Sequence, residues 1–171
     1  MTEHLIISVI SDDKPGVVKA LANAISTKGG NWLESRLSQL AGKFAGVIRV
    51  AVSTQDKESL CQALAALSGQ GIKAVVDSAD EKATTTTGKS AAFSLMGPDR
   101  AGIVYEISQA FAHYHINMEE LNTHYSSVPH SGEPMFEAEG TLTVPEDADW
   151  DKLLDQLDEI ADMLAVDIKI E

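Results

Sequence analysis

Hydrophobic residues recur along the first part of the chain with two different spacings. Over residues 4–10 they alternate, with Leu5, Ile7 and Val9 on one side, which predicts a strand that ends at Ser11. After a short turn the spacing becomes helical until two glycines at positions 29 and 30 end the pattern, through the residues Val17, Val18, Leu21, Ala22 and Ile25. The chain therefore begins with a strand, a turn and a helix.

A hairpin, a second helix and a last strand complete this pattern. Two extended stretches meet at a tight turn near Gly42, and the second of them places four apolar side chains on one face: Phe44, Ile48, Val50 and Val52. A helical pattern with Leu60, Leu64 and Leu67 follows, and residues 72–76 form the last strand. The order β-α-β-β-α-β predicts an α+β, ferredoxin-like unit, in which both helices cover one face of an antiparallel sheet.

The same order occurs twice. At a constant offset of 86 residues Asp13 matches Asp99, Gly16 matches Gly102 and Asn31 matches Asn117. If Phe44 matches Phe136 the offset grows to 92, so we expect six additional residues in the second hairpin loop. A polar, threonine-rich stretch separates the copies. We expect a first domain over residues 1–78, a linker over 79–89 and a second domain over 90–171.

The outer faces of the two expected sheets differ in polarity. The strand of the first hairpin presents Ala45, Val47, Arg49 and Ala51 on the side away from the helices, and its counterpart presents Glu137, Glu139, Thr141 and Thr143. An apolar outer face is typical of a surface that something covers. We expect the other half or a second chain to cover it, which leaves a homo-oligomer open.

The two repeated turns carry groups that suit an amino acid. A turn that opens a helix presents unsatisfied N–H groups, which attract a carboxylate, and a glycine lets a ligand approach the backbone. Asp13 and Asp99 can accept hydrogen bonds from an ammonium group, and an asparagine offers both a donor and an acceptor. The alternative stays open that Asp caps the helix, Gly makes the turn and Asn follows the helix for structural reasons alone.

With these turns, the βαββαβ order and the asparagines that open the second strand, the sequence resembles tandem ACT domains, which are small-molecule sensors that commonly bind amino acids. The resemblance implies a ligand site at Asp13, Pro15, Gly16, Val17 and Asn31, and another at Asp99, Gly102, Ile103 and Asn117. It also implies glycine as the signal and, as protein partner, a DNA-binding activator of the glycine cleavage genes. The second turn departs from the family pattern, because Ala101 replaces the proline.

Charge and composition narrow the classes of function. The chain has 26 acidic and 13 basic side chains and a net charge of -13, so we expect no direct binding to nucleic acid or to an anionic membrane surface. No apolar stretch approaches the roughly 20 residues of a membrane-spanning helix. The single cysteine, Cys61, fits a reducing compartment, and we expect the protein in the cytoplasm.

We expect neither an enzyme nor a cofactor. The sequence has no phosphate-binding loop, dinucleotide fingerprint or nucleophile elbow. The histidines at 113, 115, 124 and 130 lack the spacing of metal ligands, and two of them lie where a helix ends. We therefore assign no metal site and expect a non-enzymatic regulator. Two alternatives are a detached regulatory subunit of an enzyme of amino-acid metabolism and a small hydrolase or isomerase that uses these histidines.

Overall fold

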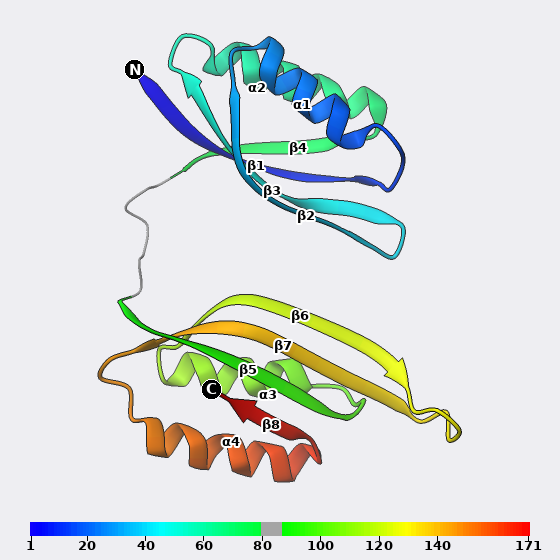
Figure 1. Ribbon diagram of the computed structural model, residues 1–171, viewed down its shortest axis with the longest axis vertical. Helices are drawn as coiled ribbons and strands as arrows, with labels where there is room; N and C mark the ends of the chain where they lie inside the picture. Colours follow the sequence, from blue (N-terminus) through cyan, green and yellow to red (C-terminus); the bar gives the residue numbers. More distant parts are fainter. Residues whose placement is uncertain (80–86) are drawn as a thin grey trace. The chain divides into compact units, whose positions relative to one another are not determined.

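A computed structural model describes residues 1–79 and 87–171 of the chain (Figure 1). The chain divides into two compact units, Met1–Ala83 and Thr84–Glu171. The expected linker over residues 79–89 falls largely on residues 80–86, which lie outside the described residues, and its last two residues, Gly88 and Lys89, belong to a strand. The domain boundaries 1–78 and 90–171 remain predictions. None of the described helices is both long and apolar enough to cross a membrane.

The first unit has the predicted βαββαβ order. Its antiparallel sheet has the strand order β2-β3-β1-β4, and both helices cover one face of it (Figure 1). A short 3-10 helix, η1, extends the second helix. The elements are β1 (Thr2–Asp12), α1 (Val17–Thr27), β2 (Asn31–Leu40), β3 (Lys43–Ser53), α2 (Lys57–Ala66), η1 (Leu67–Gln70) and β4 (Lys73–Ser78).

The second unit repeats this architecture. Its sheet has the equivalent order β6-β7-β5-β8, and its two helices again lie on one face (Figure 1). The elements are β5 (Gly88–Pro98), α3 (Ile103–His113), β6 (Asn117–Ser127), β7 (Pro134–Pro145), α4 (Trp150–Leu164) and β8 (Asp167–Ile170). The predicted fold class, two ferredoxin-like α+β units, is confirmed.

Each unit has its own hydrophobic core between sheet and helices. The predicted inward side of β1 is buried, as is the predicted apolar face of β3 from Ile48 onward. Two predicted core positions of α1 are wrong: Val18 is 48% exposed and Ala22 is exposed, while Ala24 is buried. The helix begins at Val17, and a period of 3.6 residues then turns positions 17, 21, 24 and 25 toward the sheet.

Strand register shows how closely the two units correspond. Phe44 lies opposite Ser11 in the first sheet, and Phe136 lies opposite Gly97 in the second. The predicted alignment of the two phenylalanines is therefore confirmed, and the additional residues lie in the β6–β7 connection. Each second strand also contains a bulge, between Trp32 and Glu34 in one unit and between Met118 and Glu120 in the other. These bulges were not predicted from the sequence.

Candidate functional site

The two repeated turns have the same backbone geometry. Gly16 has φ 94° and Gly102 has φ 96°, a left-handed conformation that only glycine adopts without strain, and a helix begins at the next residue. No side chain caps either helix. The first helical hydrogen bonds run from the N–H of Ala20 to Gly16 O and from the N–H of Glu106 to Gly102 O. The N–H groups of the first turn of each helix are therefore available to a ligand at the surface.

Each turn is fixed by an equivalent pair of contacts. The N–H of Asp13 donates to Gly42 O, and the N–H of Asp99 donates to Pro134 O, both at 2.9 Å, which joins the turn to the neighbouring hairpin. Next along the chain, Lys14 Nζ donates to Gln70 O at 2.7 Å, and Arg100 Nη1 donates to Met163 O at 3.2 Å.

These basic residues join each turn to the C-terminal end of the second helix, where carbonyl groups favour a cation. This role of Lys14 and Arg100 was not predicted from the sequence. At the repeat offset of 86 residues Lys14 matches Arg100. A basic side chain at the same position of both turns was the feature of the sequence that could have indicated this role.

The side chains of the predicted site differ in their exposure to solvent. Asp13, Pro15 and Asp99 are exposed, whereas Val17 and Ile103 are buried in the cores and can offer a ligand only their backbone. The alternative that Asp13 or Asp99 caps the following helix is wrong, because the N-cap residues are Gly16 and Gly102. Within the described residues, we find no hydrogen bond to either carboxylate.

Asn31 and Asn117 do not lie beside the turns of their own units. Asn31 is opposite Ala51, which is opposite His4 near the start of β1, whereas the turn follows the end of β1 at Asp12. Eight strand residues separate these positions, or about 27 Å. The second unit has the same arrangement, with Asn117 opposite Thr143 and Thr143 opposite Ser90.

This separation corrects one part of the predicted site. One amino acid cannot contact both the turn and the asparagine of a single unit. The physical reason is the direction of the first helix of the unit, which carries the chain back along the sheet before the second strand starts.

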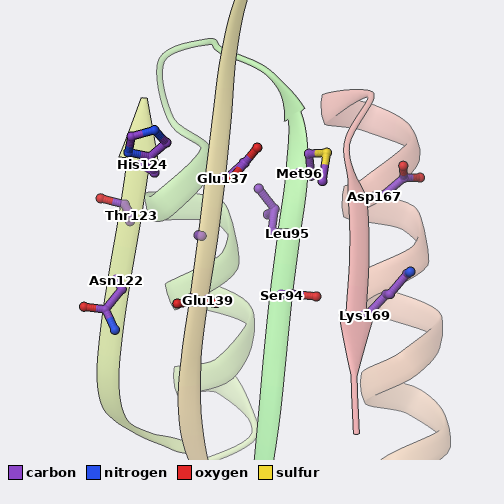
Figure 2. Close-up of a pocket in the computed structure, with 11 residues that line it drawn as sticks. Ser94, Leu95, Met96, Asn122, Thr123, His124, Glu137, Glu139, Asp167 and Lys169 are labelled. Carbon is purple, nitrogen blue, oxygen red and sulfur yellow. The ribbon is translucent and has the colours of Figure 1, made fainter. Parts of the chain in front are cut away.

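A separate hollow lies on the outer face of the second sheet, away from its helices (Figure 2). It has a volume of about 390 Å³ and is lined by residues from all four strands. Figure 2 shows side chains of both charges around it, from Glu137 and Glu139 on β7 and from Asp167 and Lys169 on β8. None of the predicted ligand-binding residues lines it. Its carboxylates suit a cationic group better than an anionic one.

Two histidines of the second unit, His113 and His115, lie where its first helix ends. Helix α3 ends at His113, and His115 has φ 55°, the same left-handed region as its counterpart Gly29 with φ 71°. The expectation that they end the helix is confirmed. Over residues 1–79 and 87–171, no group of three or more His, Cys, Asp or Glu side chains is arranged to hold a metal ion.

Comparison with known proteins identifies the type of domain. Residues 3–76 match the sequence model of the ACT domain family. The chain has a tandem ACT-like fold. A crystal structure of an unknown protein from Galdieria sulphuraria superposes with a TM-score of 0.84 at 23% identity, covering 100% of this chain and 98% of that one. A structure provisionally described as a glycine cleavage system transcriptional repressor gives 0.72 at 18% identity, covering 100% and 97%.

At these identities the two structures establish the fold of this chain and not its activity. Both superpositions extend over both units, whereas the family match is confined to the first. No curated protein matches the sequence.

Proposed function

We propose that the protein is a non-enzymatic regulator that senses a small amino acid and represses transcription of the glycine cleavage genes through a protein partner. The ACT domain match and the repeated turn geometry support a sensor. The fold shared with a structure provisionally described as a glycine cleavage system transcriptional repressor supports this choice of target, and glycine as the ligand.

The observation that carries the proposal is the pair of uncapped helices behind left-handed glycines. The amino acid's carboxylate lies against the first N–H groups of α1 or α3, where the helix dipole favours a negative charge. Its ammonium group lies toward the carboxylate of Asp13 or Asp99, which are exposed in the same turns. Within one unit about 27 Å separates the asparagine from the turn, so Asn31 or Asn117 can contact this ligand only from outside the unit that supplies the turn.

Calorimetric titration with glycine tests this site. We expect the wild-type chain to bind glycine and Asp13→Asn to bind it about tenfold more weakly, because the ammonium group then loses a charged acceptor. Asp77→Asn, an exposed position on β4, serves as the matched control and should bind like the wild type. The first turn should respond more strongly than the second, since Pro15 makes it more rigid than Ala101 does.

Two outcomes would redirect the proposal. If the wild type binds no glycine, the protein is not a glycine sensor, and a protein-interaction module becomes the better description. If Glu139→Gln abolishes glycine binding while Asp13→Asn and Asp99→Asn do not, the ligand lies in the hollow of the second sheet.

The mode of repression is tested with DNA and with the partner. Because acidic side chains outnumber basic ones by two to one, the purified chain should not retard an operator duplex in a gel at physiological salt. A retarded band from this chain alone would contradict action through a partner. Affinity purification of the native complex should recover a DNA-binding activator, whereas recovery of a metabolic enzyme would favour the alternative of a detached regulatory subunit.

A further inference from the structure

The outer face of the first sheet is apolar at its centre. We call it the first outer face; it is centred on Ile6, Ile10, Val47 and Val75, which point away from the helices and lie around the exposed Ser8. Ile10 is 48% exposed, Val47 is 43% exposed and Val75 is 62% exposed. Exposed side chains of this size gathered on one sheet face are typical of a contact surface.

The corresponding surface of the second unit is different at equivalent positions. We call it the second outer face. By strand register, Val47 corresponds to Glu139, Ala45 to Glu137 and Val75 to Lys169. Two sheets with the same topology therefore carry different outer surfaces, although the counterpart of Ile10, Met96, is also apolar and is 51% exposed. The difference lies on the outer faces, because the inner faces of both sheets build apolar cores.

Charge separates the two faces further. The first outer face carries side chains of both signs, with Arg36, Arg49 and Lys73 near Glu34 and Asp77, and Arg49 lies 3.5 Å from Glu34. The second outer face is acidic: its two hollows are lined by Lys169 and by the carboxylates of Glu120, Glu137, Glu139, Asp167 and Glu171. Two second outer faces would repel each other, whereas two first outer faces can place opposite charges together.

We propose that two copies of the chain form a dimer by packing their first outer faces against each other. A two-fold axis places the same patch on both sides of the contact, so the patch must be complementary to itself. An apolar centre with charges of both signs around it satisfies this condition. A shallow hollow of about 570 Å³ beside Val47, lined also by Ile6 and Arg36, offers space for side chains of the second copy.

The size of the surface agrees with a dimer of moderate affinity. Four strands spaced about 4.8 Å apart, with roughly eight residues each in the contact, give a face of about 500 Å² per copy. Two such faces bury about 1,000 Å², near the lower limit for a specific interface. We therefore expect a dissociation constant in the micromolar range. The inference does not depend on glycine binding.

Analytical ultracentrifugation of the full chain tests the dimer. At about 100 μM the wild type should sediment as a dimer of 18.3 kDa chains. Val47→Glu should sediment as a monomer, because it places a carboxylate at the centre of the contact. The fold should tolerate this change, since the second sheet holds Glu139 at the equivalent position. Ala22→Glu, on the exposed side of α1 in the same unit, is the matched control and should remain a dimer.

Three results would overturn the inference. The first is a wild type that stays monomeric at about 100 μM. The second is a Val47→Glu variant that keeps its native circular dichroism spectrum and still dimerises. The third is a dimer that dissociates on the change Glu139→Lys but not on Val47→Glu. In the first case something other than a second copy covers the first outer face. In the third case the contact lies on the second sheet.

Discussion

At the scale of single residues, the strand-to-helix turns depend on a conformation more than on a side chain. A β-carbon added to Gly16 or Gly102 would meet no atom within 4 Å, so the space at both positions is open. What favours glycine there is φ near 95°. A valine at position 16 would therefore strain the backbone, and its effect on a ligand could not be separated from its effect on the fold.

The strain at Gly16 has a measurable consequence. Gly16→Ala should lower the free energy of unfolding by about 1–2 kcal/mol, because an L-residue in the left-handed region crowds its own carbonyl. Gly69→Ala is the control: a β-carbon there also meets nothing within 4 Å, and Gly69 does not have positive φ. Urea denaturation of both variants checks this. Equal midpoints for the two variants would show that the turn tolerates a side chain.

Asp149 gives a prediction that depends on pH. Its carboxylate accepts hydrogen bonds from the side chain and the backbone N–H of Lys152 at the start of α4, and these contacts lower the pKa of Asp149. A lowered pKa stabilises the folded state above the ordinary carboxyl pKa of about 3.9, and this stabilisation is lost as the pH falls through the lower folded value.

Asp149→Ala should therefore lower the melting temperature by a few degrees at pH 7 and have little effect near pH 2. Asp147→Ala, an exposed position two residues earlier, should leave the melting temperature unchanged at both values. Thermal unfolding followed by circular dichroism measures both variants. A loss for Asp149→Ala that is equal at the two pH values would mean that the cap does not act through the ionised carboxylate.

At the scale of elements, the repeat made most of the fold predictable. The alternation and the helical spacing of hydrophobic residues predicted the strands and helices. The change of the repeat offset from 86 to 92 residues at Phe136 predicted the insertion in the second hairpin. The bulges in β2 and β6 were not predictable, because neither is marked by a glycine. The position of Asn31 was misjudged for a different reason. It follows α1 closely in sequence, but the helix has by then carried the chain to the opposite end of the sheet.

The β6–β7 insertion should be removable. Ser126 and Met135 pair as Leu40 and Lys43 do in the first unit, where only Ala41 and Gly42 connect the strands. Replacing residues 127–134 by Ala-Gly should keep the native fold and change the free energy of unfolding by no more than about 1 kcal/mol, because loop closure depends weakly on length. The new glycine would also keep the carbonyl that accepts from Asp99 N–H.

A one-residue deletion within β6 is the control for the loop replacement. Removing Thr123 alone would shift the following strand residues to the opposite face of the sheet and should prevent stable folding. Proton NMR spectra of both variants distinguish a folded from an unfolded second unit. Loss of the fold on the Ala-Gly exchange would mean that the longer loop itself stabilises the hairpin.

At the scale of the whole molecule, the net charge belongs almost entirely to one unit. Residues 1–79 carry eight basic and seven acidic side chains, whereas residues 87–171 carry four basic and 17 acidic ones. The acidic side chains of the second unit lie both on its outer sheet face and along α4. Such a concentration of like charge keeps a unit soluble and weakens its compact state through self-repulsion. The two units should therefore differ in their response to salt although they share a fold.

Salt should stabilise the second unit selectively. At about 0.01 M salt the screening length is about 30 Å, so most carboxylates of the second unit repel one another, whereas at about 0.1 M it falls to about 10 Å. Hydrogen exchange read by mass spectrometry should show greater protection of β5 to β8 at the higher salt concentration and little change in β1 to β4. The double variant Glu137→Gln/Glu139→Gln should show part of this increase in protection already at low salt, because two of the repelling charges are removed. An equal response of both units would mean that salt acts on hydrophobic burial rather than on charge.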